Sequence, residues 1–106
     1  MAWLLLVLAG VFEVGMALSL KASEGFTVPR ASIAFGVFSV ISFSLLATAL
    51  KDLPVGTAYA VWTGIGAAGT ALLGIAVFGD SANPVRLGSI ALIIAGVVGL
   101  RVAGTS

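Results

Sequence analysis

The sequence predicts an all-helical membrane protein whose chain crosses the bilayer four times. Of its 106 residues, 60% are hydrophobic and only 8% are charged, against roughly 25% charged residues in an ordinary soluble domain. A soluble domain of this size leaves roughly a third or more of its unfolded surface in water, and five basic and four acidic side chains cannot cover that surface. The hydrophobic residues also fall into long runs separated by short polar stretches. A soluble or disordered chain is therefore excluded.

The composition also excludes several kinds of chemistry. The chain has no cysteine and no histidine, which excludes disulfide scaffolds, thiol redox chemistry, histidine-based triads and zinc sites built on these residues. Its net charge of +1 gives no electrostatic reason to expect nucleic acid as a partner. We expect no cofactor, no metal and no enzymatic activity, because the only deeply placed acid, Glu13, has no nucleophile activated beside it.

The expected helices cover about residues 2–20, 31–50, 55–78 and 85–103 of a single domain, 1–106. A helix needs about 20 apolar residues to cross the hydrocarbon core, and the first three runs meet that length. The fourth run is shorter, but Arg86 and Arg101 at its ends can bury their stems and keep their charges at the interface. The runs do not alternate and are too long for β-strands.

The first run has a second interpretation, as a cleavable signal peptide. Such a peptide carries positive charge ahead of its apolar stretch. No Lys or Arg precedes the run here, and Glu13 interrupts it. We therefore interpret this run as the first membrane helix.

Three polar stretches separate the runs: residues 21–30, 51–56 and 79–84. Each contains glycine or proline, which end helices or start them. In the last stretch, Gly79 suits a helix C-terminus, Asn83 suits an N-cap, and Pro84 suits the first position of the next helix. The sequence therefore predicts short loops between consecutive helices.

The basic residues give the chain almost no preferred orientation. With four spans, both termini lie on one side, which also carries Lys51 and Arg101, whereas the other side carries Lys21, Arg30 and Arg86. An excess of Lys and Arg on one side normally fixes the orientation of a membrane protein. Here the two sides differ by one basic residue, and the positive amino terminus cancels that difference. Either other residues decide the orientation, or the chain inserts both ways and two copies pair antiparallel, as inverted repeats do within larger transporters.

Glu13 is the only ionisable side chain far from an interface. A charge at this depth is costly and normally faces a cavity or a partner, and no Lys or Arg lies at a comparable depth. Glu13 must therefore hold a proton or bind a cation from outside. A site that accepts either ligand, but not both together, is the minimum needed for proton/cation exchange. The alternative is an acid that only hydrogen-bonds a neighbouring helix.

The residues one turn from Glu13 leave room for a ligand. Ala9, Gly10 and Ala17 are small, and Met16 has a flexible side chain. Small residues also allow two helices to approach closely. Two interpretations are therefore possible. Gly10 and Met16 line a cavity, or the small residues form a close contact with another helix.

The third run adds Tyr59 and Trp62, three residues apart on one helix face. Aromatic faces attract cations, and a phenol can hydrogen-bond a carboxylate; an interfacial aromatic belt is the alternative. The second run adds Ser42 and Phe43. Because a serine in a membrane helix often bonds its own backbone, Ser42 alone is weak evidence for a site.

Small residues mark two further segments. In the third run, Gly64 and Gly66 lie in a small-residue stretch at mid-membrane, which indicates either a hinge for alternating access or a tight packing face. In the fourth run, Ser89 and Gly96 are seven residues apart and repeat on one face, which is typical of a helix–helix seam.

Together these features resemble the small multidrug resistance transporters. The resemblance rests on Glu13 in the first span, Lys21 and the following SEGFT (23–27), the LPVGTAYAVWTGIG segment (53–66) and the small-residue fourth helix. It covers essentially the whole chain. It implies an antiparallel, dual-topology dimer of four-helix subunits in the bacterial inner membrane, exchanging protons for cations.

The resemblance also implies roles for individual residues. Glu13 corresponds to the membrane-embedded glutamate of the family, Tyr59 and Trp62 to its aromatic pair, and the fourth helix, with Ser89 and Gly96, to its dimerisation helix.

Within the family, Ser42-Phe43, the GTAYAVWTGIGAAG segment and Arg101 look closer to the guanidinium-exporter branch. That branch implies that Ser42 and Trp62 belong to a hydrogen-bond network around Glu13. It usually has a tryptophan one turn after the glutamate, where this chain has Met16, which cannot donate a hydrogen bond.

The sequence therefore predicts a proton-coupled antiporter that exports guanidinium or related small organic cations, working as a homodimer in the lipid bilayer. The alternatives are a quaternary-ammonium multidrug exporter, one subunit of a heterodimeric pair and, from another class, a non-transporting membrane assembly subunit. The predicted proton and substrate site comprises Glu13, Tyr59, Trp62 and Ser42. The predicted pocket lining comprises Gly10, Met16 and Phe43.

Overall fold

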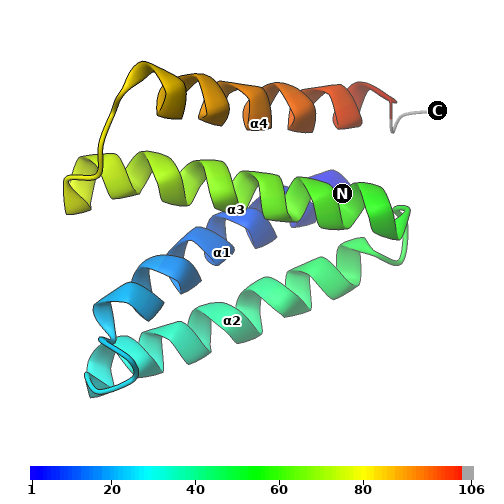
Figure 1. Cartoon of the computed structure of the whole chain (residues 1–106). Coiled ribbons are helices and arrows are strands. Elements are labelled where there is room, and N and C mark those ends of the chain that lie inside the picture. The colour runs from blue at the N-terminus through cyan, green and yellow to red at the C-terminus, as the bar shows by residue number, and fades with distance from the viewer. Residues whose placement is uncertain (104–106) are drawn as a thin grey trace.

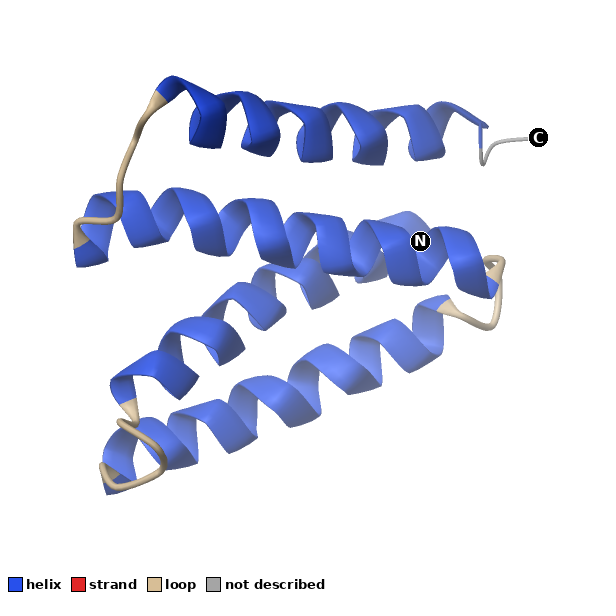
Figure 2. Cartoon of the chain, viewed as in Figure 1, coloured by secondary structure: helices blue, strands red, loops and turns tan. Residues whose placement is uncertain are grey.

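The computed structural model describes residues 1–103, which form four helices in an antiparallel up-and-down order: α1 (Ala2–Ala22), α2 (Pro29–Ala49), α3 (Val55–Phe78) and α4 (Pro84–Ala103) (Figure 1). No strand occurs within this range (Figure 2). All four helices are long and apolar enough to cross a membrane. The prediction of an all-helical chain with four spans is confirmed.

The helix ends differ from the expected ones by a few residues. Helix α1 continues to Ala22, and α2 begins at Pro29 rather than after Arg30. Proline suits the first turn because its missing N–H would be unpaired there. Gly79 ends α3 with φ of 70°, and the Asn83 side chain accepts the backbone N–H of Arg86 at 2.8 Å. The predicted glycine terminus and asparagine N-cap are therefore confirmed.

The loop between α1 and α2 is organised by Ser23, which is fully buried. Its hydroxyl donates to the carbonyl of Leu20 at 2.7 Å and accepts the backbone N–H of Phe26 at 3.1 Å. The three residues after it have positive φ: 48° at Glu24, 72° at Gly25 and 66° at Phe26. Only glycine adopts this region at little cost. The hydrogen bonds to Ser23 therefore offset the backbone strain at Glu24 and Phe26.

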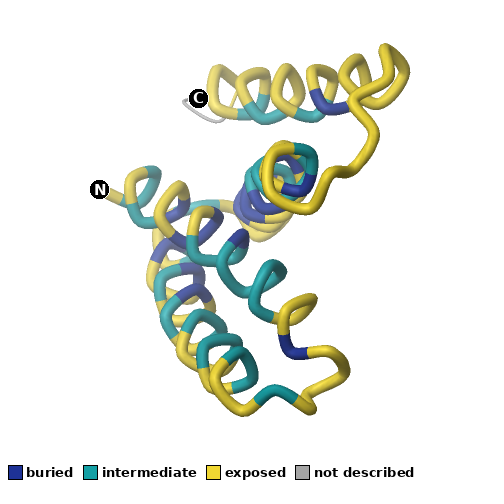
Figure 3. The backbone as a smooth tube through the Cα atoms, turned by 90° about the vertical axis from the view of Figure 1, so that its left-hand side faces the viewer, coloured by how far each residue is buried: buried dark blue, intermediate teal, exposed yellow. Residues whose placement is uncertain are grey.

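The helices form an open layer rather than a closed bundle. Helix α1 packs along both α2 and α3, whereas α4 packs along α3, does not reach α2, and meets α1 at the contact between Arg101 and Trp3. Figure 3 shows that the buried positions gather where α1, α2 and α3 meet, and that α4 is almost wholly exposed. Within α4, only Ile90 is buried. The result is a flat molecule of 45 × 34 × 17 Å.

The core lies between α1, α2 and α3 and combines larger side chains with three alanines, which let helices approach closely. Its buried members are Leu6, Ala9, Leu46, Ala49, Ala58, Val61 and Trp62. Two glycines allow the same approach between α1 and α3. A Cβ on Gly10 would lie 2.6 Å from Ile65 Cγ2, and one on Gly69 would lie 2.6 Å from Val14 Cγ2.

Two cation–π contacts tie the helix ends together. At one end, the Lys21 ammonium of α1 lies 5.2 Å from the Phe78 ring of α3. At the other end, the Arg101 guanidinium of α4 lies 5.0 Å from the Trp3 ring of α1. Both cations lie at the ends of apolar helices, where a membrane protein keeps its charges.

Candidate functional site: a half-buried glutamate against a glycine

The Glu13 carboxylate lies directly against the backbone of α3 at Gly66. A Cβ placed on Gly66 would overlap the carboxyl group, coming nearest to its carbon and Oε1. Gly66 is itself buried between the two helices. The absence of a side chain at this position therefore creates the space that the acid occupies.

Glu13 Oε1 is buried and has no hydrogen-bond partner. Within residues 1–103, no Lys or Arg lies close enough to form an ion pair with it. A buried acceptor without a donor is costly and uncommon in folded proteins. This oxygen is thus an open position for a proton or for a ligand that brings its own donors.

Ser42 connects the three core helices through its hydroxyl group, which is fully buried. The hydroxyl donates to the backbone carbonyl of Ala9 on α1 at 2.6 Å and accepts the indole N–H of Trp62 on α3 at 3.0 Å. Its neighbour Ser39 instead donates to Phe35 O of its own helix at 2.7 Å. Ser39 therefore bonds the backbone of its own helix, whereas Ser42 is part of a hydrogen-bond network between helices.

This network leaves Glu13 without a donor. The single hydroxyl proton of Ser42 is used at Ala9, and the single N–H of Trp62 is used at Ser42. Ala9 lies one turn before Glu13, so the network fixes the backbone on which the acid stands. It holds the surroundings of the carboxylate in place without neutralising it.

An aromatic wall adjoins this network. The Trp62 ring lies between two others, 5.4 Å from the Phe43 ring of α2 and 5.6 Å from the Tyr59 ring of the same helix. Trp62 is 6% exposed, whereas Phe43 and Tyr59 are 50% and 58% exposed. A buried, hydrogen-bonded Trp62 does not fit an interfacial belt, and the two exposed rings place this aromatic wall at the surface of the molecule.

The other predicted site residues are more scattered. Met16 is half-buried on α1, one turn beyond Glu13. Gly10 is buried, and its lack of a side chain leaves room for Ile65 of α3. Gly64 receives a methyl group of Val97 from α4, since a Cβ there would lie 2.6 Å from Val97 Cγ2.

Helix α3 runs unbroken through Gly64 and Gly66, so a hinge at this segment stays a prediction. On α4, Ser89 is exposed and donates to Val85 O of its own helix at 2.8 Å. Gly96 is also exposed, with open space where a Cβ would stand. Both residues therefore lie on the exposed surface of α4.

Sequence reasoning missed two features of this site. It did not find that Gly66 supplies the space for Glu13, although the spacing of one turn between Trp62 and Gly66 is visible. It also did not find the carbonyl of Ala9 as the acceptor for Ser42. Both are contacts between helices, and no pattern within one helix reveals its partner's register.

A comparison with protein families identifies the chain. The family described as Small Multidrug Resistance protein matches residues 1–93. This chain belongs to the small multidrug resistance family. The match includes α1, α2 and α3 entire, and therefore every residue of the carboxylate site.

Curated members of the family are similar over nearly the whole chain. A guanidinium exporter of Escherichia coli (strain K12) is 52% identical over 103 residues, covering 97% of this chain and 98% of the relative. A guanidinium exporter of Yersinia pseudotuberculosis is 54% identical, with 97% and 99% covered. One of Salmonella typhimurium is 50% identical, with 97% and 98% covered. Family membership and four apolar helices identify a multi-pass protein of the bacterial inner membrane.

Proposed function

We propose that this small multidrug resistance protein exports guanidinium or related small organic cations in exchange for protons, with Glu13 as the shared binding group. The observation that carries the proposal is the buried Glu13 Oε1 without a donor, lying against Gly66 beside the Ser42–Trp62 network. The relatives named guanidinium exporters support the choice of substrate.

Guanidinium matches what the carboxylate lacks. Its planar array of N–H groups can donate two parallel hydrogen bonds to one carboxylate, and charge-assisted bonds of this kind are short and strong. The Trp62 ring beside the site offers a face to the cation, and cation–π attraction strengthens where water is excluded. The ligand would thus supply both the positive charge and the donors.

Proton coupling follows from competition for the same oxygen atoms. One carboxylate carries one negative charge, so it can be neutralised by a proton or by the cation, but not by both. Proton binding on one side of the membrane would release the cation, and cation binding on the other side would release the proton. A coupled exchange needs only that the loaded site can face either side.

We further propose that the working unit is an antiparallel, dual-topology homodimer. Three observations support it: Phe43 and Tyr59 place the aromatic wall at the surface of the molecule, α4 presents an exposed face with Ser89 and Gly96, and the basic residues are balanced between the two sides of the membrane. A second, related chain in place of the identical copy is the alternative form of the same assembly.

Met16 favours one alternative substrate class, the quaternary ammonium compounds. Its side chain is half-buried one turn from Glu13 and has no donor for the carboxylate. A flexible thioether adapts to irregular apolar groups, and the alkyl substituents of a quaternary ammonium cation are groups of this kind. Comparing guanidinium with tetrapropylammonium separates the two classes.

The test uses purified protein in vesicles on a solid-supported membrane, with transport currents measured for both cations. We expect guanidinium currents in the unmodified protein that weaken as the pH falls, because protons compete for Glu13. Glu13→Gln keeps the shape but cannot exchange a proton, so its currents should vanish. Glu24→Gln, the same change in an exposed loop, should leave them intact. Residual proton-coupled uptake by Glu13→Gln would contradict the proposal.

A further inference from the structure

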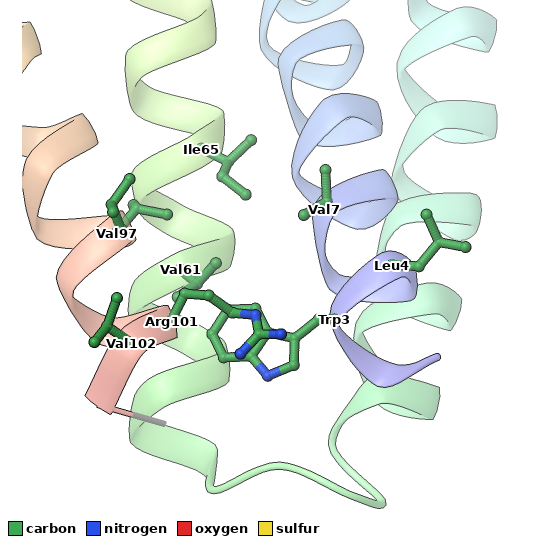
Figure 4. Close-up of a pocket in the computed structure, with 9 residues that line it drawn as sticks. Trp3, Leu4, Val7, Val61, Ile65, Val97, Arg101 and Val102 are labelled. Carbon is green, nitrogen blue, oxygen red and sulfur yellow. The ribbon is translucent and has the colours of Figure 1, made fainter. Parts of the chain in front are cut away.

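An apolar cavity of about 430 Å³ opens between α1, α3 and α4 at the end where the chain begins. Figure 4 shows its walls, with Val7 of α1, Val61 and Ile65 of α3 and Val97 of α4 around the opening. Its volume lies within the range of about 300–1,000 Å³ found for ligand sites. The cavity exists because α4 packs along α3 and its backbone stays away from that of α1.

A second apolar cavity of about 250 Å³ continues the first between α3 and α4. The two share Ile65, Val97 and Val98, so they form one groove. The groove extends along α3 to Leu72 and along α4 to Ile94. From Arg101 to Ile94 this is about 10 Å of helix, at 1.5 Å per residue. The groove thus runs from the helix end toward the middle of the membrane.

The only charge in this groove lies at its outer end. The Arg101 guanidinium carbon lies over the Trp3 ring, 5.0 Å from its centre (Figure 4). A guanidinium has five N–H donors, and a ring face does not accept all of them, so N–H groups of Arg101 remain to bind an anion. No carboxylate within residues 1–103 pairs with Arg101. Among the described residues, the groove therefore combines a long apolar wall with one cation that has no carboxylate partner.

This groove is separate from the carboxylate site, because neither Glu13 nor Gly66 lines it. A small cation does not fit a groove whose one charge is positive. The matching ligand is long and apolar, with an anionic group at the membrane surface. We propose that the groove binds an anionic phospholipid, with an acyl chain along α3 and α4 and the headgroup phosphate on Arg101.

The test places the full-length protein in phosphatidylcholine vesicles with a trace of phosphatidylglycerol that carries a photoactivatable group in its acyl chain. A phosphatidylcholine probe with the same chain serves as the neutral comparison. Mass spectrometry then locates the labelled residues. We expect labelling of residues 61–72 and 94–98 to be about fivefold stronger with the anionic probe, the effect of ~1 kcal/mol for one basic residue at an anionic surface.

Matched variants identify the parts of the site. Arg101→Gln should reduce labelling by the anionic probe to the level of the neutral one, and Arg101→Lys should preserve most of the preference. Arg86→Gln removes the same charge from the other end of α4 and should change nothing. Val98→Phe fills the groove from an exposed position, and should lower labelling by both probes, whereas Leu92→Phe, outside the groove, should not.

Several outcomes would overturn the proposal. Equal labelling by the two probes would exclude an anionic ligand, and an equal effect of Arg86→Gln and Arg101→Gln would reduce it to general surface charge. A second copy of the chain could also occupy the groove. Because the sequence has no cysteine, Val98→Cys tests this directly: efficient disulfide cross-linking of two copies, without lipid labelling, would replace the lipid by the partner chain. None of these readouts depends on transport.

Discussion

Gly66 and Glu13 form a contact that depends on the absence of a single atom. Every other residue type carries a Cβ, and a Cβ at position 66 would overlap the carboxyl group. Because Gly66 lies inside a regular helix, replacing it should not weaken that helix, and alanine has the higher helix propensity. A substitution here can therefore move the acid without unfolding its support.

We expect Gly66→Ala to displace the carboxylate and to reduce guanidinium transport by tenfold to a hundredfold, the effect of losing one hydrogen bond to a charged group, about 1.5–3 kcal/mol. Gly56→Ala is the control, because it lies on the same helix with open space where its Cβ would stand. Currents from reconstituted protein and thermal unfolding would be measured together. Normal currents in Gly66→Ala would mean that the contact does not position the acid.

Ser42→Ala should affect stability as well as transport. The change leaves the buried N–H of Trp62 without an acceptor, at a cost of about 1–3 kcal/mol. Ser39→Ala removes a hydroxyl that bonds only its own helix and should cost less. Unfolding in denaturant would be compared for Ser42→Ala, Ser39→Ala, Trp62→Phe and the double variant Ser42→Ala/Trp62→Phe. If the double variant is as unstable as the two single changes added together, the hydroxyl and the indole are not coupled.

At the scale of residues, the sequence identifies the chemical groups of the site but not their pairing. The depth and isolation of Glu13 follow from composition alone, because every other charge stands at the edge of an apolar run. The pairing of Ser42 with Ala9 and Trp62 depends on how α2 lies against α1 and α3. Helix register is set by the sum of many weak packing contacts, so it could not be derived from spacing within one helix.

Helix α4 is the element with the weakest attachment to the rest of the chain. Only Ile90 of this helix is buried, and one of its contacts with α3 is the fit of Val97 against Gly64. Its length and its composition were predictable from the sequence. Its separation from α1 was not, because a uniformly apolar helix carries no polar face that would indicate which side meets its neighbour.

Gly64→Ala should loosen the attachment of α4. A Cβ at this position would lie 2.6 Å from Val97 Cγ2, and overpacking of this kind costs about 1–3 kcal/mol. Val97→Ala removes the opposing methyl groups, so the double variant should regain most of the lost stability. The free energy of unfolding of the three variants would test this. An unchanged stability in Gly64→Ala would show that α4 moves aside freely.

The loop between α1 and α2 shows the limit of prediction for connections. The sequence indicates a turn from Gly25, but the structure also places Glu24 and Phe26 at positive φ. Neither residue type favours this region. They adopt it because the buried Ser23 binds the backbone on both sides of the turn, and the burial of Ser23 follows from tertiary packing rather than from the local sequence.

The whole molecule has its basic residues divided almost evenly between its two ends. The antiparallel order of the helices puts Lys51 and Arg101 at the end of the termini and Lys21, Arg30 and Arg86 at the other (Figure 1). The order of the helices therefore agrees with the division of two and three basic residues that was expected from the sequence.

We expect the unmodified chain to insert in both orientations. Adding two lysines to residues 51–55 should fix one orientation, and adding them to residues 24–30 should fix the other, because cytoplasmic loops retain positive charge. Each fixed form alone should be inactive, and co-expression should restore guanidinium export. Reporter fusions at the C-terminus measure the orientation. A single orientation of the unmodified chain would contradict dual topology and would require a parallel or heteromeric assembly.

The even number of helices also determines what gene fusion can do with this protein. Because the amino terminus and the end of α4 lie at the same end of the molecule (Figure 1), two copies joined head to tail by a short polar linker must face the same way. One additional membrane-spanning segment in the linker reverses the second copy. In such a fused pair, the linker sequence determines the relative orientation of the two subunits. In separate chains, that orientation depends on how each copy inserts.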